Sequence, residues 1–321
     1  MSHTREMIGR ISKDAGFRPE HVEKVLWLLD LLDGLMRHPF LADKLALKGG
    51  TALNLFHYPL PRLSVDVDLN YIGSADRETM LGEKPGIEKA IEGVCQRLGV
   101  SVRRRPAEHS GGKWSLRYPS VLTPGGNLEL DLNYLLRVPL WPVQWLRSVP
   151  LGDRSCAEIP VLDLHELAAG KLAALFARSA PRDVFDAVAL LGDRRIRKED
   201  LRLGFVIYGA MNRRDWREVD VQDISVEEDQ YRNEVSVLLR QLGDRLSTGA
   251  EMVNRCRSQI AEVLLPMRDA ELEFLRLINE EGIIRPELLA AEEARQALVA
   301  SHPALLWKVQ SVRRFRGLSD P

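Results

Sequence analysis

Two aspartates, two positions apart, are the residues of this sequence best suited to chemistry. Asp66 and Asp68 lie in the segment Leu-Ser-Val-Asp-Val-Asp-Leu at residues 63–69. Polar and apolar residues alternate over residues 64–71, which predicts a strand with both carboxylates on one face, their Cβ atoms roughly 7 Å apart. Such a pair can hold Mg²⁺, and two Mg²⁺ ions can stabilise the attacking and leaving oxygens of a phosphoryl or nucleotidyl displacement. Acids on exposed edge strands share this pattern, so a metal site needs support from other residues.

A glycine turn precedes the aspartates. Gly49, Gly50 and Thr51 follow a short apolar run and come directly before a segment that predicts a helix. Backbone N–H groups at a helix N-terminus bind phosphates, and Thr51 adds a hydroxyl donor. We therefore expect these residues, with Lys48 before them, to contact the triphosphate of a nucleotide. The alternative interpretation is a tight turn between a strand and a helix.

A third carboxylate, Asp131, lies on another alternating segment at residues 127–134. If this strand pairs beside the first, three acids come together. Clustered and partly buried acids are costly unless a metal ion neutralises them. We therefore predict Asp131 as a metal ligand together with Asp66 and Asp68.

A lysine and a following acidic turn form a second group. Lys171 lies in the middle of a largely apolar helix predicted at residues 164–177, where it either extends to solvent or reaches a triphosphate. Pro181 suits the first turn of the next helix. Arg182, Asp183 and Asp186 then fall in its first two turns. The helix dipole favours Asp183 there, whereas Asp186 is placed to orient Lys171 or an acceptor hydroxyl.

These residues must be positioned by an α+β architecture. An amphipathic helix at residues 21–36 and several alternating segments predict a mixed-sheet core at residues 1–160. Residues 161–321 read as a helical domain that completes the active site. Its later helices are expected at residues 235–246, 251–264, 269–279 and 286–300.

Composition excludes several classes of protein. The chain has 321 residues, of which 45% are hydrophobic and 28% charged, as in an ordinary globular protein. No apolar run approaches the roughly 20 residues of a membrane span, and the first residues do not resemble a secretory signal, so we expect a cytoplasmic protein with no membrane contact. The scattered Cys95, Cys156 and Cys256 indicate neither disulfides nor a zinc site.

The charge is uneven along the chain. The net charge of −1 argues against a surface that coats nucleic acid everywhere. Residues 94–118, however, hold six Arg or Lys, including Arg103, Arg104 and Arg105, against one acid. Residues 192–217 hold eight, including Arg194 and Lys198, against four acids. Each cluster is either a solvated face or a contact for a polyanionic substrate.

The ordered set of motifs resembles the AbiEii-like and MenT-like nucleotidyltransferases, which are toxins of bacterial toxin–antitoxin pairs. The resemblance covers roughly residues 40–190 and rests on Lys-Gly-Gly-Thr-Ala-Leu at 48–53, Arg-Leu-Ser-Val-Asp-Val-Asp-Leu at 62–69, Leu-Asp-Leu at 130–132, His-Glu-Leu-Ala-Ala-Gly-Lys at 165–171 with Arg178, and Pro-Arg-Asp-Val-Phe-Asp at 181–186. It implies a DNA-polymerase-beta-like core followed by a helical domain. Residues beyond about 200 carry no part of it.

The resemblance also assigns roles. Ser64 and Asp66 match the first catalytic pair of the family, Asp68 the second metal ligand, Lys171 the motif lysine and Asp186 the downstream acid, a role that the neighbouring Asp183 can share. It implies a Mg²⁺-dependent enzyme, with two ions, that moves a nucleoside monophosphate from an NTP to an acceptor. Following the family, the acceptor is the 3′ end of tRNA and the protein is a toxin with a separately encoded antitoxin. Arg182 and Asp183 are expected beside the NTP.

Two other functions stay open at this stage. The same chemistry can modify a Ser, Thr or Tyr hydroxyl of a protein. Alternatively, the chain is an inactive RNA-binding or antitoxin-like module that uses the two basic clusters. The clustered acids argue against an inactive protein, because a site without activity has no reason to keep them.

Overall fold

The computed structural model describes residues 3–105, 111–240 and 247–318. The chain divides into two compact units. The first unit comprises Met1–Asp163 together with Ser236–Arg245, and the second comprises Leu164–Val235 and Leu246–Pro321. The described part of this segment, residues 236–240, thus returns to the first unit. The division into a nucleotidyltransferase core at residues 1–160 and a helical domain at residues 161–321 that completes the active site remains a prediction.

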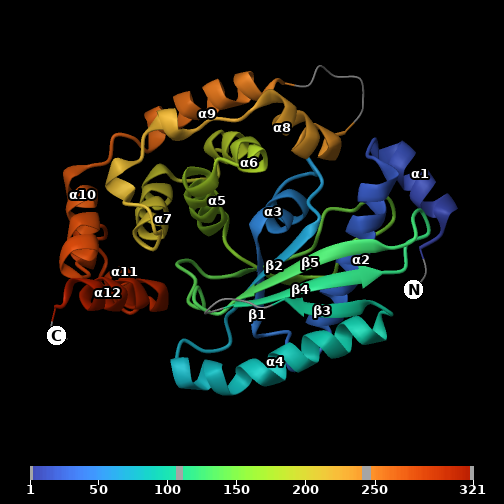
Figure 1. The fold of residues 1–321 in the computed structure, drawn as a ribbon, viewed down its shortest axis with the longest axis horizontal. Helices are drawn as coiled ribbons and strands as arrows, with labels where there is room; N and C mark the ends of the chain where they lie inside the picture. The colour runs from blue at the N-terminus through green and yellow to red at the C-terminus, as the bar shows by residue number, and fades with distance from the viewer. Residues whose placement is uncertain (1–2, 106–110, 241–246, 319–321) are drawn as a thin grey trace. The chain divides into compact units, whose positions relative to one another are not determined.

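A seven-stranded sheet forms the centre of the first unit (Figure 1). Its order is β3-β4-β5-β2-β1-β7-β6. The strands are β1 (Leu45–Lys48), β2 (Asp66–Tyr71), β3 (Ser101–Arg105), β4 (Gly111–Tyr118), β5 (Gly126–Asn133), β6 (Gln144–Leu146) and β7 (Ile159–Val161). The pairs β2–β5 and β1–β7 are parallel and the others antiparallel. The predicted mixed sheet is confirmed.

Alternation along the strands separates an apolar face from a polar one. Val67 and Leu69 of β2, Leu130 of β5 and Trp114 of β4 are all fully buried. Their neighbours along each strand point to the opposite face, which carries Asp66 and the other acids. The strand predicted at residues 64–71 is therefore present, and its aspartates leave the face that does not form the core.

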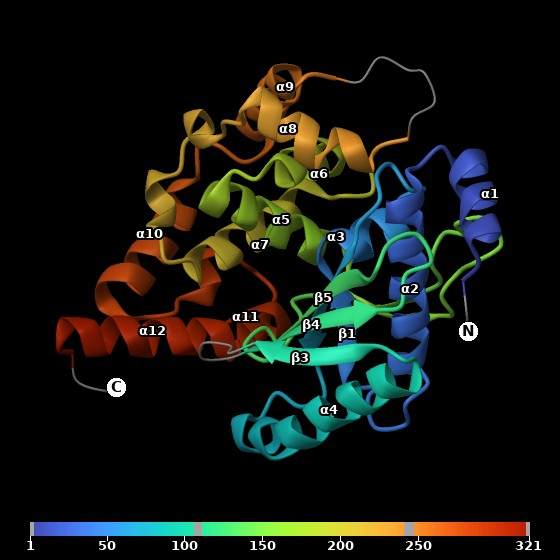
Figure 2. The ribbon, with the colours of Figure 1, turned by 45° about the vertical axis from the view of Figure 1, so that its right-hand side comes forward.

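Helices cover the apolar side. The expected helix at residues 21–36 is α2 (Pro19–Met36), which begins with a proline at its first turn. It contacts α1 (Arg5–Ala15), β5 and α4 (Arg77–Arg97), and α4 runs along β3 in both Figure 1 and Figure 2. Gly34 of α2 lies so close to Val94 of α4 that a Cβ would approach its side chain to 2.8 Å. The glycine therefore lets the two helices pack closely.

The second unit is built of helices. They are α5 (Leu164–Arg178), α6 (Pro181–Leu191), α7 (Lys198–Ala210), α8 (Glu228–Glu234), α9 (Gly249–Val263), α10 (Asp269–Arg276), α11 (Glu293–Ala300) and α12 (Pro303–Arg316). α5 packs on α6 and α7, and α6 packs on α9. Phe176, Phe205 and Trp216 form an aromatic cluster with ring centroids 5.2–5.7 Å apart. No helix among the described residues combines the length and apolar character that a membrane span requires.

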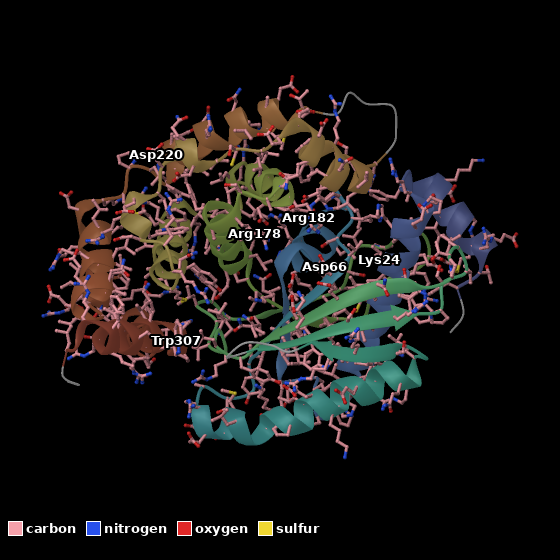
Figure 3. The ribbon with its side chains drawn as sticks, in the orientation of Figure 1. Lys24, Asp66, Arg178, Arg182, Asp220 and Trp307 are labelled. Atoms are coloured by element: carbon pink, nitrogen blue, oxygen red, sulfur yellow. The ribbon has the colours of Figure 1, made fainter. Side chains whose placement is uncertain are left out.

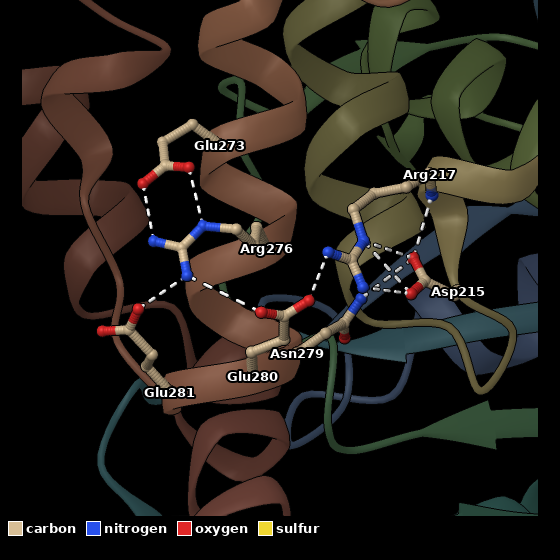
Figure 4. A network of polar contacts seen from close by, with 7 residues as sticks. All are labelled: Asp215, Arg217, Glu273, Arg276, Asn279, Glu280 and Glu281. Carbon is tan, nitrogen blue, oxygen red and sulfur yellow. Dashed lines mark hydrogen bonds and ion pairs between the residues drawn. The ribbon is translucent and has the colours of Figure 1, made fainter.

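A chain of ion pairs ties the C-terminal helices of this unit together (Figure 4). Arg217 contacts Asp215 and Glu280, both at 2.6 Å. Arg276 contacts Glu273 at 2.8 Å and Glu281 at 2.7 Å. The hydrogen bond from Arg217 is the largest cause of the lowered pKa of Glu280. The arginines thus connect a loop after α7 to the turn that follows α10.

The expected helix at residues 235–246 is wrong in its described part. Only the short 3-10 turn Ser236–Leu238 forms, and residues 241–246 lie outside the described part of the chain. The backbone N–H of Leu63 donates to the carbonyl of Leu238 at 2.9 Å, and Arg62 forms a β-bridge with Leu239. The helical spacing of Leu238 and Leu239 with their neighbours predicted a helix, but these contacts with the first unit form instead. The helix expected at 286–300 is likewise interrupted, since α11 begins only at Glu293.

Candidate active site

The glycine turn brings backbone against one of the aspartates. Lys48 ends β1 and pairs with Asp68 on antiparallel β2. Gly49 follows with a φ of 73°, and a Cβ on it would lie 2.3 Å from Oδ2 of Asp68. Only glycine combines this left-handed conformation with so close an approach. The start of α3 (Gly49–Ala52), which continues as a π-helical turn at Leu53–His57, is thereby fixed beside the Asp68 carboxylate.

Thr51 holds the strand on which the aspartates lie. Its side chain is fully buried, and its hydroxyl donates to the backbone carbonyl of Asp66. The Oγ1 atom also lies 3.1 Å from Oγ of Ser64, which is itself buried. A hydroxyl has a single proton, so donation to the carbonyl leaves Thr51 none to give to a phosphate. In this structure Thr51 and Ser64 therefore support the backbone of Asp66.

Four carboxylates line one face of β2 and β5, which we call the acidic face. Parallel pairing sets Asp66 beside Glu129 and Asp68 beside Asp131. The two aspartates of β2 are half-buried, whereas Glu129 and Asp131 are about 40% exposed. The sequence named three of these residues as ligands. Alternation along residues 127–134 already predicts Glu129 on the same face as Asp131, and the register adds that Glu129 lies beside Asp66.

Lys113 of β4 is bonded to two of the four acids. It pairs in register with Asp131, and its Nζ lies 3.1 Å from Oε2 of Glu129 and 3.3 Å from Oδ2 of Asp131. Burial lowers the pKa of Lys113, but the hydrogen bonds and negative charges of Glu129 and Asp131 outweigh it, so its pKa is raised. The ammonium stays charged and partly neutralises the acidic face.

The donor set fits a hard divalent cation. Asp66 and Asp68 offer carboxylate oxygens that are partly open to solvent, and such oxygens are the ligands that Mg²⁺ prefers. Within residues 3–105, 111–240 and 247–318, no three His, Cys, Asp or Glu side chains gather closely enough to hold one ion. Asp131 as a third ligand thus stays a prediction, since its carboxylate contacts Lys113 here.

In the second unit, the predicted lysine and aspartates come together. Nζ of Lys171 lies 2.8 Å from Asp186 and 3.2 Å from Asp183. Both aspartates are almost fully buried, and the Lys171 side chain is 11% exposed. The contact of Asp186 with Lys171, one of its two expected roles, is present. Lys171 does not extend to solvent, because the α5–α6 turn folds both acids over its ammonium.

Two arginines stand at this turn (Figure 3). Arg178, at the end of α5, donates from Nε to Asp183 at 2.7 Å. Its own side chain is 63% exposed, so one end of the pair is open to solvent. Arg182, at the start of α6, is half-buried. Asp183 therefore contacts two cations, Lys171 and Arg178. These ion pairs explain its position better than the capping of a helix alone.

The basic clusters separate into exposed and neutralised parts. Arg103 and Arg117 are exposed, and the register of β3 and β4 sets them on the same face as Lys113. Arg104 points to the other face and contacts Glu88 of α4 at 3.0 Å. The side chain of Arg105 lies outside the described part of the structure. Around Arg194 the charges pair locally: Arg195 contacts Asp193, Arg197 contacts Asp200, and Lys198 donates to the carbonyl of Glu262.

A mixed sheet with paired aspartates beside a glycine turn, followed by a helical unit, is an arrangement that suits a nucleotidyltransferase. The family model described as "Nucleotidyl transferase AbiEii toxin, Type IV TA system" matches residues 30–307, and the chain belongs to this family. Among solved structures, it is similar to MenT4, a nucleotidyltransferase toxin from Mycobacterium tuberculosis H37Rv, with a TM-score of 0.58 and 19% identity over 98% of this chain and 99% of that one. That likeness supports the fold. A comparison with curated proteins gave no match.

Proposed function

We propose that this AbiEii-family protein transfers a nucleoside monophosphate from an NTP to the 3′ end of tRNA, with Mg²⁺ as its metal. In this reaction a terminal ribose hydroxyl attacks the α-phosphorus, the α–β phosphoanhydride bond breaks, and pyrophosphate leaves. One observation carries the proposal: Asp66 and Asp68 share a half-open face directly beside the Gly49 turn. Carboxylates held this way suit metal ions that also bind phosphates.

Each group of residues has a separate task in this proposal. Asp66 and Asp68 hold the metal, and Thr51 with Ser64 keeps the backbone of Asp66 in position. Bound Mg²⁺ would stabilise the attacking and leaving oxygens of the displacement. Lys48, Gly49 and Gly50 are proposed to contact the NTP through their backbone and charge. Thr51, expected from the sequence to contact it too, is better explained as a supporting residue.

The helical unit supplies the second set of proposed NTP contacts. Lys171 and Arg182 would bind phosphate oxygens as cations. Asp183 and Asp186 fix the ammonium of Lys171, because a lysine between two buried carboxylates has little freedom to move. Ser64, Asp66, Asp68, Lys171 and Asp186 remain the proposed catalytic residues.

The family makes an antitoxin the expected partner, and we propose that it is separately encoded. NTPs and tRNA are substrates of the cytoplasm, so the proposed reaction assigns the protein to that compartment. Arg103 and Arg117 support a nucleic-acid acceptor, because they extend the acidic face with a row of exposed cations.

The test is acceptor labelling. Purified protein is incubated with each α-labelled NTP, Mg²⁺, total tRNA and cell protein, and Asp66→Asn is run beside it. We expect label at the 3′ end of tRNA with the wild type alone. Label in the protein fraction would replace the acceptor with a protein hydroxyl. No label in either fraction, with any NTP, would leave an inactive RNA-binding or antitoxin-like module as the function.

A further inference from the structure

We propose that Lys113 is the resident counter-ion of the acidic face and competes with the divalent cation for Glu129 and Asp131. Lys113 thereby sets the affinity of the site for the divalent cation. This inference rests on the metal-dependent function proposed above. Neither Lys113 nor Glu129 belongs to the residues that the sequence motifs single out.

Geometry places the lysine in competition with a metal. The ammonium lies within hydrogen-bonding distance of one oxygen on each of the two acids, 3.1 Å for Glu129 and 3.3 Å for Asp131. Asp131 is also the register neighbour of Asp68. An ion held by Asp68 and Asp131 would have to take an oxygen that Lys113 now contacts. Two cations that share one carboxylate repel each other, so binding of one weakens the other.

Burial indicates why the lysine matters more for metal binding than for folding. Lys113, Glu129 and Asp131 are 37–43% exposed, and ion pairs at such positions contribute little to stability. A divalent ion carries twice the charge and depends on the same oxygens. Removal of the lysine should therefore change the affinity for metal while leaving the fold nearly unaffected.

The lysine also has the mobility that this role needs. Its ammonium stands on a flexible four-carbon stem and can leave a carboxylate without a backbone movement. Its neighbours on the same face, Arg103 and Arg117, are exposed cations. When metal displaces Lys113 from Asp131, the released ammonium joins this row, where a phosphate of the substrate can contact it. Metal loading and anion binding would then support each other.

The first experiment titrates the metal-free protein with Mg²⁺ and with Mn²⁺ by calorimetry. We expect Lys113→Met to bind about five- to tenfold more tightly than the wild type, as removal of a partly screened like charge implies. Arg117→Met is the matched control, since Arg117 lies on the same strand and face but opposite Asn127, and its Kd should not change. Lys113→Gln serves as a second variant that keeps a polar end.

The outcomes separate the two proposals. If the wild type binds metal, Asp66→Asn does not, and both Lys113 variants bind as the wild type does, the counter-ion role is overturned and the metal site stands. If neither the wild type nor the Lys113 variants bind metal, both proposals fall. Equal tightening by Lys113→Met and Arg117→Met would reduce the effect to general surface charge and would also overturn the role of Lys113.

A second readout follows the lysine itself. Amine-reactive labelling of the wild type, resolved by peptide, should modify Lys113 about two- to fivefold faster once Mg²⁺ is added, because an amine that no longer lies between two carboxylates is more accessible to the reagent. Lys44, which contacts Glu83 at 2.8 Å away from the acidic face, is the internal control and should not respond. A Lys113 rate that stays the same or falls would contradict the displacement.

Discussion

The buried hydroxyl of Thr51 supports the backbone of Asp66. Thr51→Val keeps the shape of the side chain but removes the hydrogen bond to the Asp66 carbonyl. Removing the partner of a buried polar group costs about 1–3 kcal/mol, so the unfolding free energy should fall by that amount and transfer should slow. Denaturant unfolding and label incorporation measure the two effects. Thr51→Ser removes only a methyl group, and a Val variant as stable as the Ser variant would contradict this role.

The negative charge of Asp66 can be tested separately from the position of its backbone. Asp66→Asn keeps the shape and removes the charge, so we expect transfer to be abolished and metal affinity to fall, while the thermal unfolding midpoint stays near that of the wild type. Asp43→Asn is the matched control, because Asp43 is an exposed acid of the same unit. Transfer by Asp66→Asn at the wild-type rate would remove the metal interpretation.

Lys171 combines a structural and a functional expectation. Lys171→Met leaves the buried carboxylates of Asp183 and Asp186 with less compensation, so it should destabilise the protein by about 3 kcal/mol or more. Adding Asp186→Asn removes one of these charges and should restore part of the stability. Chemical denaturation of the wild type, the single and the double variant measures this.

Activity of the double variant then separates the two roles. Because Asp186 is itself a proposed catalytic residue, Asp186→Asn alone is measured beside the double variant. If Lys171 contacts the NTP, the double variant uses NTP more poorly than Asp186→Asn alone. Turnover equal to that of Asp186→Asn alone in the folded double variant would show that Lys171 only packs. The sequence suggested one contact of this group, Asp186 with Lys171, and the structure adds Asp183 and Arg178 to it.

At the scale of strands, the basic edge of the sheet makes the acceptor testable. Arg103→Gln with Arg117→Gln should weaken RNA binding and reduce the slope of log affinity against log salt by up to about 2, because each arginine that neutralises a phosphate contributes about one to that slope. Arg104→Gln is the matched control, since this side chain contacts Glu88 on the opposite face. Binding is measured at several salt concentrations. A control variant that binds RNA as weakly as the double variant would exclude this face.

Local sequence patterns predicted individual helices and strands well, but they could not predict which distant strands pair or in which register. The helix at α2 and the alternation of β2 follow from spacing within one segment, so the sequence was sufficient for both. The bond of Lys113 to Asp131 depends on β4 pairing with β5 in one register, which no single segment contains. Alternation predicted that Glu129 shares a face with Asp131, but only the register shows that it lies beside Asp66. No helix was predicted at α12, although it carries local helix signals, a proline in its first turn and a left-handed Gly317 after its end.

At the scale of the whole molecule, two separate segments of the chain contribute to the first unit, one before residue 164 and one after residue 235. Leu238 and Leu239 are buried there, and the carbonyl of Leu238 accepts the N–H of Leu63, which is followed by Ser64 and the acidic strand. Leu239→Ala should lower the unfolding free energy by about 2–4 kcal/mol and speed hydrogen exchange at the Leu63 amide. Leu318→Ala, at a position 41% exposed, should do neither. Unchanged exchange at Leu63 in the Leu239 variant would contradict this pairing.

The contribution of residues 236–240 to the first unit has a consequence for folding during synthesis. A ribosome delivers α5 to α8 before residues 236–240 emerge, so the segment beside Leu63 stays unpaired for a time on the order of ten seconds after β7 has been made. A nascent chain that stops short of this segment lacks the residue that forms the β-bridge with Arg62. We expect ribosome-bound chains that end before residue 236 to incorporate no label, unlike released full-length protein. A cell that abandons translation midway would then be left with a fragment that has no transfer activity.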